Sequence, residues 1–304
     1  MEGTGERTVD DVRAGLEAQD YLTDEGLATI VFLALELGRP LLLEGEPGVG
    51  KTEVARALSR WTGGDLLRLQ CYEGIDAAQA LYEWDYTRQL LHLRTAEAAG
   101  GTAAASELED ELYSERFLIK RPLLQAIATA SSGVPPVLLI DEVDRADDEF
   151  EAFLLEVLSD FAVTVPELGT FRTDTPPIVI VTSNRTRDVH DALKRRCLYH
   201  WVEHPDFERE VQIVRRRAPQ VGEKLARQVA AAVAGLRGLE LYKPPGVAET
   251  IDWAVALGRL GCAELDAASV EASLGAVVKY AEDRDKVATN GTQSLIAQAL
   301  AATS

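Results

Sequence analysis

The sequence predicts an α/β fold, a parallel sheet with helices on both faces, followed by a smaller all-α domain. Three short apolar runs, Leu41–Leu43, Val137–Ile140 and Ile178–Val181, have the length and composition of strands that are buried on both faces. Helical stretches separate these runs, and such alternation is typical of parallel sheets. After Pro205 strand signals largely stop, and stretches rich in Ala, Leu and Arg continue to the end of the chain.

The first helix is predicted between a start signal and a stop signal. Thr23 can cap a helix whose first turn carries acidic residues, and Gly38 followed by Pro40 ends it. The apolar positions between them keep helical spacing: Leu27, Ile30, Val31, Ala34 and Leu37. The strand at Leu41–Leu43 comes next, and a second helix is expected from Lys51 to about Trp61.

The later elements follow from the same patterns. An amphipathic helix after the second apolar run places large apolar residues on one face: Phe150, Phe153, Leu154, Val157 and Leu158. Phe161–Arg172 alternates around a turn and predicts a β-hairpin. Leu198–Val202 is expected to be a strand, so we do not interpret His200 and His204 as a helical metal pair. The Ala-, Gly-, Ser- and Glu-rich stretch from about Thr95 to Leu112 indicates a mobile loop or a frayed helix.

Composition and charge narrow the class of protein. The 304 residues are 46% hydrophobic and 27% charged, and they contain no apolar run long enough to cross a bilayer. Met1–Glu6 is acidic and polar, unlike a signal peptide, so we expect a cytoplasmic protein without membrane insertion. A net charge of −19 repels phosphate backbones, so no nucleic-acid partner is expected. Cys71, Cys197 and Cys262 lack CxxC spacing and are expected to be reduced thiols, mostly buried.

A phosphate-binding loop is predicted between the first strand and the second helix. Eight consecutive residues fit the pattern G-x-x-x-x-G-K-[ST]: Gly45, Glu46, Pro47, Gly48, Val49, Gly50, Lys51 and Thr52. Glycines let the backbone wrap a phosphate chain with its N–H groups pointing inward, and the helix adds the positive end of its dipole. Lys51 is expected to reach the β- and γ-phosphates of ATP, and the Thr52 hydroxyl is expected to bind Mg²⁺.

Two adjacent carboxylates end the second buried strand. Asp141 at the strand tip can hold Mg²⁺, directly or through water, and Glu142 can polarise the water that attacks the γ-phosphate. Alone, this pair is equally compatible with a strand that simply meets solvent. Together with the phosphate loop, it indicates a hydrolytic site.

Polar and basic residues follow the third strand. Asn184 ends it and is expected to orient the attacking water, although an Asn in a turn would be the simpler interpretation without the other motifs. Arg196, or alternatively Arg195, can act as an arginine finger that stabilises charge on the transferred phosphoryl group. The competing interpretation of this pair is a solvated basic helix end. Arg215–Arg217 has no such context and is interpreted as a solvated or interface helix face.

These motifs occur in an order that resembles AAA+ ATPases, in which they are called Walker A, Walker B, sensor 1 and the arginine finger. Three further stretches, Leu69–Gly74, Ala80–Tyr86 and Asp191–Trp201, are similar to the MoxR group and, within it, to the CoxD-like branch. The resemblance covers roughly residues 20 to 290. It implies an N-terminal extension at 1–20, an AAA+ α/β domain at 21–204 with an insertion near 74–94, and an α-helical lid at 205–304.

The resemblance also implies a role. MoxR-like proteins form homo-oligomeric rings, usually hexamers, and are thought to act as ATP-driven chaperones of partner proteins, often ones with von Willebrand factor A domains. The CoxD-like branch is linked to maturation of the molybdenum–copper centre of carbon monoxide dehydrogenase. The resemblance therefore implies Mg²⁺-dependent ATP hydrolysis that remodels or matures a protein partner.

One departure from the family concerns the lid. The lid usually carries an arginine after Ser-Pro, called sensor 2, whereas the corresponding stretch here, Lys243–Val247, places Gly246 at that position. Two interpretations stay open. Lys243 substitutes for the arginine, or the lid is coupled more weakly to hydrolysis.

Two other functions share the nucleotide motifs. A nucleic-acid motor is disfavoured by the acidic charge and by the absence of a recognisable DNA-reading module. A nucleotide-dependent binding switch with little turnover is disfavoured by Glu142. Aromatic residues in the expected insertion either contact a protein partner or pack the insertion against its own core: Tyr72, Tyr82, Trp84 and Tyr86.

Overall fold

The computed structural model describes residues 7–98, 105–130, 133–290 and 292–301, which form two compact units. The first unit comprises Met1–Val12, Gly26–Glu44 and Leu58–His200. The second comprises Arg13–Glu25, Gly45–Ala57 and Trp201–Ser304, so the phosphate loop belongs to the same unit as the C-terminal helices. The domain boundary expected between residues 204 and 205 stays a prediction.

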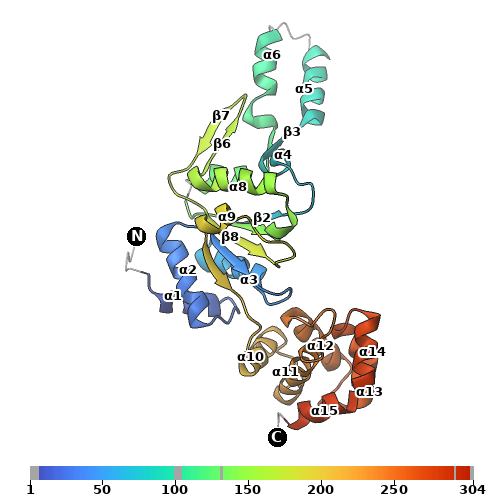
Figure 1. The fold of residues 1–304 in the computed structure, drawn as a ribbon. Coiled ribbons are helices and arrows are strands. Elements are labelled where there is room, and N and C mark those ends of the chain that lie inside the picture. The colour runs from blue at the N-terminus through green and yellow to red at the C-terminus, as the bar shows by residue number, and fades with distance from the viewer. Residues whose placement is uncertain (1–6, 99–104, 131–132, 291, 302–304) are drawn as a thin grey trace. The chain divides into compact units, whose positions relative to one another are not determined.

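A five-stranded sheet organises the first unit (Figure 1). In sheet order, its strands are β2 (Leu66–Gln70), β5 (Val137–Asp141), β8 (Ile178–Ser183), β1 (Leu41–Glu44) and β9 (Leu198–Trp201). The β2–β5, β5–β8 and β8–β1 pairs are parallel, with Gln70 opposite Asp141 and Glu44 opposite Ser183. The polar residues that end these strands therefore meet at one edge of the sheet, and the predicted α/β class is confirmed.

The strands expected at 41–43, 137–140, 178–181 and 198–202 are confirmed as β1, β5, β8 and β9. The sequence does not predict β2. This strand lies at the sheet edge and buries only Leu69 fully, so its residues Leu66–Gln70 lack the continuous apolar run of a central strand.

Helices flank the sheet (Figure 1). The expected helices are confirmed as α2 (Glu25–Leu37), α3 (Lys51–Thr62) and α8 (Asp148–Asp160), and the structure adds α1 (Val9–Glu17), α7 (Pro122–Ala130) and α9 (Asp191–Arg196). Asp147 caps α8, because its carboxylate accepts from the Phe150 N–H at 2.9 Å. The α7 helix packs against β2 and β5, and its apolar face joins the core of the first unit.

Between β2 and α7 the chain leaves the central sheet. It forms α4 (Ala77–Leu81), β3 (Tyr82–Trp84), α5 (Tyr86–Ala98), α6 (Ala105–Leu112), a 3₁₀ turn at Glu115–Phe117 and β4 (Leu118–Lys120). The β3 and β4 strands pair antiparallel. The α5 and α6 helices lie side by side, since Gln89 Nε2 donates to the Leu112 carbonyl oxygen at 2.6 Å (Figure 1). The insertion expected near 74–94 falls within this excursion.

The stretch expected to be a mobile loop or frayed helix is helical in its described parts, at the end of α5 and in α6; residues 99–104 lie outside the described residues. Alanine and glutamate are strong helix formers, and this preference explains why the described parts of the stretch are helical. Among the aromatic residues, Trp84 is only 7% exposed and makes edge-to-face contacts with Tyr82 and Tyr113. Trp84 is therefore a packing residue, whereas Tyr86 is 68% exposed.

The predicted hairpin is confirmed as β6 (Ala162–Val165) paired with β7 (Gly169–Arg172). In the second unit, the described residues after β9 form only helices and loops. The helices are α10 (Phe207–Arg217), α11 (Glu223–Arg237), α12 (Val247–Arg259), α13 (Ala267–Val277), α14 (Ala281–Asn290) and α15 (Thr292–Ala301). Their core contains the fully buried Trp253, whose indole N–H donates to Ser273 Oγ at 2.8 Å. Within the described part of the chain, no helix has both the length and the apolar character needed to cross a membrane.

Candidate functional site

The phosphate loop connects β1 to α3 and belongs to the second unit. Gly48 and Gly50 have φ angles of +84° and +98°, a left-handed region that favours glycine. Lys51 is 6% exposed, and its Nζ donates to the carbonyl oxygens of Gly45 and Glu46, each at 2.7 Å. The ammonium group is thus held against the backbone of the loop, at the first residue of α3.

The loop makes a close backbone contact with Gly246, the N-cap residue of α12. A Cβ atom on Gly246 would lie 2.6 Å from Gly48 Cα and 2.8 Å from the Gly48 carbonyl oxygen. The Val247 N–H donates to that same oxygen at 2.9 Å. At the position where the resemblance expects an arginine, the backbone of Gly246 is therefore in close contact with the backbone of Gly48. Lys243 is exposed, and its own N–H donates to Asp283 Oδ2 at 3.1 Å.

A buried ion pair holds the turn before α12. Arg237 donates to both carboxylate oxygens of Glu210, at 2.7 and 2.8 Å, and its Nε donates to the Pro245 carbonyl oxygen at 2.8 Å. The Thr250 hydroxyl donates to Glu210 Oε1 at 2.7 Å. Glu210 is 1% exposed, and removing one partner of such a pair leaves an uncompensated buried charge. Arg237 therefore positions the turn that contacts the phosphate loop.

His204 also contacts the phosphate loop, at Glu46. Its Nε2 lies 3.1 Å from Glu46 Oε2, while its Nδ1 is buried without a hydrogen-bond partner. Burial lowers the pKa of His204, and the nearby Arg237 charge lowers it further, against the opposing effect of Glu46. The surroundings of His204 thus favour the neutral imidazole.

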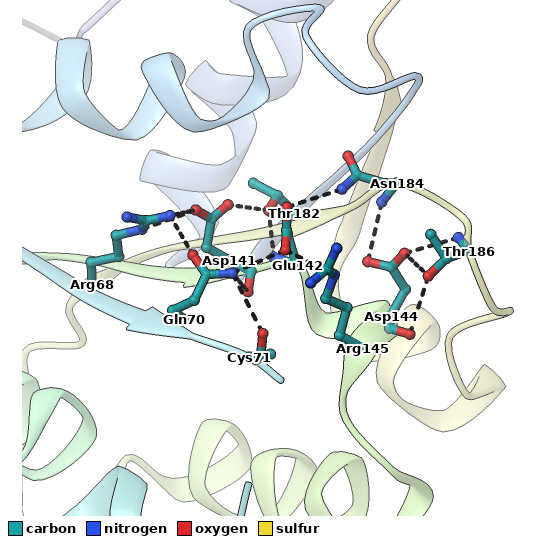
Figure 2. Close-up of polar contacts among 10 residues, drawn as sticks. All are labelled: Arg68, Gln70, Cys71, Asp141, Glu142, Asp144, Arg145, Thr182, Asn184 and Thr186. Carbon is teal, nitrogen blue, oxygen red and sulfur yellow. Dashed lines mark hydrogen bonds and ion pairs between the residues drawn. The ribbon is translucent and has the colours of Figure 1, made fainter. Parts of the chain in front are cut away.

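Asp141 ends β5 at the carboxyl edge of the sheet and is 3% exposed (Figure 2). Its Oδ1 accepts from the Thr182 hydroxyl at 2.6 Å. Its Oδ2 accepts from Arg68, from Nε at 2.9 Å and from Nη2 at 2.6 Å. The next residue of β2, Leu69, points into the core, so Arg68 and Gln70 face the site together.

Glu142 follows directly and is the centre of the contacts in Figure 2. Its backbone is left-handed, with φ of 57° and ψ of 52°, and its N–H donates to Thr182 Oγ1 at 2.9 Å. Oε1 accepts from Asn184 Nδ2 at 3.3 Å, and Oε2 accepts from Gln70 Nε2 at 3.1 Å. Arg145 Nε lies 3.0 Å from Oε2. A non-glycine residue in this conformation is uncommon and is often found at functional sites.

Asn184 is held in place by Asp144, which lies in the 3₁₀ turn Val143–Arg145 after β5. Asp144 is 2% exposed and accepts from the N–H groups of Asn184 and Thr186, at 3.2 and 2.9 Å, and from the Thr186 hydroxyl at 2.6 Å. Three donors satisfy this buried carboxylate, so the loop after β8 is fixed relative to β5. Asp141, Glu142 and Asn184 are therefore brought together, and the roles expected of them stay predictions.

Arg195 and Arg196 are exposed at the end of α9. Arg39 caps this end, because its Nη2 donates to the carbonyl oxygens of Arg195 and Arg196 at 2.9 and 3.0 Å. A guanidinium at a helix C-terminus satisfies orphan carbonyls and complements the helix dipole. The geometry leaves both candidate finger side chains directed away from the core, and their role stays a prediction.

The residues fit the groups that the sequence predicts. The loop offers a buried ammonium at a helix N-terminus, which suits a phosphate chain. The Asp141 carboxylate already binds a guanidinium, so its surroundings accommodate a positive charge. Oxygen donors such as Asp141 and the Thr52 hydroxyl are those that Mg²⁺ prefers.

Among the residues that contact Asp141, Glu142 or Asn184, sequence reasoning misses five: Arg68, Gln70, Asp144, Arg145 and Thr182. The polar residues at alternate positions of Arg68-Leu69-Gln70 are a possible signal for the first two, since they share one face of a strand. The thiol beside them, Cys71, is inert, because burial, with a smaller contribution from Asp141, raises its pKa to about 12.

Comparisons with known proteins bear on the family to which the chain belongs. Residues 40–197, which are 158 of the 304 residues, match the family model described as AAA domain (dynein-related subfamily). The chain is also 27% identical over 195 residues to the uncharacterized protein YehL of Escherichia coli strain K12, a match that covers 60% of this chain and 47% of that protein. The chain thus spans about half the length of this curated relative. AAA domains bind nucleotide, and the matched range includes the phosphate loop, Asp141, Glu142 and Asn184. By this match the chain belongs to the dynein-related subfamily of AAA domains.

Proposed function

We propose that this protein is a MoxR-like AAA+ ATPase that hydrolyses ATP with Mg²⁺ and uses the energy to remodel a protein partner in the cytoplasm. The observation that carries the proposal is the Glu142 carboxylate, which stands next to Asp141 and is oriented by Asn184 from the neighbouring strand. A base, a metal-binding acid and an amide at one sheet edge are what phosphoryl transfer to water requires.

Each residue has a role in this proposal. Lys51 binds the β- and γ-phosphates, and Asp141 and the Thr52 hydroxyl hold Mg²⁺. Mg²⁺ held by these two residues would supply charge neutralisation on the phosphates, which would make the γ-phosphorus easier to attack. Glu142 Oε1 accepts a proton from the attacking water, and Asn184 Nδ2 holds that carboxylate in position.

The test compares Glu142→Gln with the wild-type protein. The amide keeps the shape of the side chain and loses the base, so ATP binding should persist while turnover falls at least about 100-fold. Lys51→Ala should instead lose ATP affinity by about 10- to 100-fold, because a charge-assisted hydrogen bond is removed. Calorimetry measures binding, and phosphate release measures turnover.

Glu83→Gln is the matched control, since Glu83 is an exposed glutamate that pairs with Arg121 in the excursion between β2 and α7. It should bind and hydrolyse ATP like the wild type. Near-normal turnover by Glu142→Gln would remove Glu142 from the role of base. If the wild-type protein binds ATP and shows no turnover in any assembly state, it is a nucleotide-dependent switch. Stimulation of turnover by DNA would favour a nucleic-acid motor.

We further propose a homo-oligomeric ring, with six subunits as in the MoxR group, in which Arg196 or Arg195 reaches the neighbouring subunit's nucleotide. The exposure of both side chains at the end of α9 supports this assignment. A finger that acts across a subunit boundary makes specific activity rise with protein concentration. Strictly linear activity from a monomer would contradict it.

The partner is proposed to be a protein with a von Willebrand factor A domain or a metalloenzyme under maturation, such as carbon monoxide dehydrogenase. This follows from the CoxD-like resemblance. The α5 helix supports a protein contact of some kind, because Tyr86, Leu90 and Leu91 are 68%, 53% and 65% exposed. Large apolar side chains that stay exposed on one helix are typical of interaction surfaces.

A further inference from the structure

The Asp141 carboxylate has a positively charged partner within the protein. Arg68 donates two N–H groups to Oδ2, at 2.9 and 2.6 Å, and the Thr182 hydroxyl occupies Oδ1 at 2.6 Å (Figure 2). Both oxygens of the residue expected to hold Mg²⁺ are therefore engaged by side chains. Because a guanidinium and a metal ion both carry positive charge, they compete for the same carboxylate.

The two partners of this ion pair differ in burial. The Asp141 side chain is 4% exposed, whereas the Arg68 side chain is 46% exposed. A carboxylate so far from water needs a counter-charge, since an isolated buried anion is costly. Because the Arg68 guanidinium is already nearly half in water, it can move into solvent with little change in its own hydration. The Asp141 carboxylate thus stays in the protein interior, whereas the Arg68 guanidinium can move away from it into solvent.

We propose that Arg68 is a counter-ion that Mg²⁺ replaces. Arg68 neutralises Asp141 when no metal is bound and releases the carboxylate when Mg²⁺ binds with ATP. The inference rests on the proposed function, because it concerns the same metal site. Half-saturation of the site should therefore require a higher Mg²⁺ concentration than it would if Arg68 did not compete for Asp141.

The exchange has a consequence for the base. Arg68 Nη2 also donates to Gln70 Oε1, and Gln70 Nε2 donates to Glu142 Oε2 at 3.1 Å. When Arg68 leaves Asp141, Gln70 loses one of the groups that orient its amide, while the carbonyl oxygens of Cys71 and Asp141 still accept from Nε2 at 3.4 and 3.5 Å. The hydrogen bond from Gln70 to Glu142 is then less constrained, so binding of the metal is coupled to the position of the base through Arg68 and Gln70.

The experiment measures how nucleotide binding depends on Mg²⁺ in Arg68→Ala. The probe is a fluorescent N-methylanthraniloyl derivative of ATPγS, titrated with Mg²⁺ from an EDTA-treated protein. Removing the competitor should lower the Mg²⁺ midpoint about fivefold, equivalent to about 1 kcal/mol. Arg68→Lys, which keeps the charge and loses the two-pronged contact, should lower it by a smaller factor. In EDTA without nucleotide, Arg68→Ala should also melt at a lower temperature than the wild type, because the buried Asp141 carboxylate has lost its ion pair with the guanidinium.

Arg121→Ala is the matched control, since Arg121 is 45% exposed and pairs with Glu83 on the surface. Its Mg²⁺ midpoint should equal that of the wild type. An unchanged or higher midpoint in Arg68→Ala overturns the proposal, and weaker binding at every Mg²⁺ concentration would make Arg68 a nucleotide contact instead. If Arg68→Ala does not fold, Arg68→Lys decides by the same criterion. A wild-type protein that binds no probe at any Mg²⁺ concentration would contradict the proposed function itself, whereas wild-type binding with no shift in the variants contradicts only the role of Arg68.

Discussion

Replacement of Gly246 by alanine tests the contact between α12 and the phosphate loop. Gly246 has a φ angle of −86°, which any residue can adopt, so the requirement for glycine is one of space alone. The new Cβ would lie 2.6 Å from Gly48 Cα, 2.8 Å from its oxygen and 2.9 Å from its carbonyl carbon. All three atoms belong to backbone, so relief requires that the loop and the helix move apart.

The expected effect combines two terms. Overpacking of a tight contact costs about 1–3 kcal/mol. Separation also weakens the Val247 N–H to Gly48 hydrogen bond, worth about 1 kcal/mol. The substitution should therefore destabilise the protein by about 2–4 kcal/mol. Because Gly48 lies within the phosphate loop, ATP affinity should also fall, by about tenfold for each 1.4 kcal/mol lost from binding.

Thermal unfolding and calorimetric ATP binding measure the two effects. Gly275→Ala is the control, because a Cβ at this position of α13 meets no atom within 4 Å. Alanine in a helix interior is favoured over glycine by roughly 0.5–1 kcal/mol, so this variant should be slightly stabilised and bind ATP normally. If Gly246→Ala matches the wild type in both assays, the close approach of Gly246 to Gly48 matters neither for stability nor for nucleotide binding.

Three further predictions concern other regions. Arg196→Ala should bind ATP yet lose about 10³-fold in turnover, and mixing it with Glu142→Gln subunits should restore activity; no recovery would argue against action across subunits. Burial lowers the pKa of His204 in the folded protein. When the pH falls below the ordinary histidine pKa of 6.5, His204 is therefore protonated more readily in the unfolded chain than in the folded protein. Stability is thus complete above that pH and declines as pH falls, and His204→Gln should flatten the decline in urea unfolding; an unchanged slope would exclude His204 as its source. In the Glu142→Gln background, Tyr86→Ala should reduce recovery of a protein partner in pull-downs, whereas Tyr242→Ala, an exposed tyrosine outside α5, should not; recovery of nucleic acid alone would contradict the proposed remodelling function.

Much of the candidate site can be predicted from the sequence because its motifs are local. The phosphate loop is a run of eight residues between a strand and a helix, and each of its features depends on neighbours in the chain. Asp141, Glu142 and Asn184 follow apolar runs whose strand character is legible without tertiary information. Parallel strands end at one edge, so the meeting of Glu142 and Asn184 also follows from the fold class.

Other features depend on contacts between distant parts of the chain, and the sequence alone does not reveal them. Arg68 and Asp141 are 73 residues apart, and their contact exists because β2 pairs with β5 after the long excursion between them. Gly246 is 198 residues from Gly48, and its need to be glycine arises only from the backbone that it meets (246 minus 48). Trp84 and Tyr86 are both aromatic residues of the expected insertion, and their sequence context does not distinguish them. Packing nevertheless buries Trp84 and leaves Tyr86 exposed. The nucleotide motifs and the α/β class can be read from the chain directly, because hydrogen-bonding periodicity and turn chemistry act over a few residues. The charges that face Asp141 and the residues that contact the phosphate loop depend on the complete fold, because strand order and close packing are set by the whole chain.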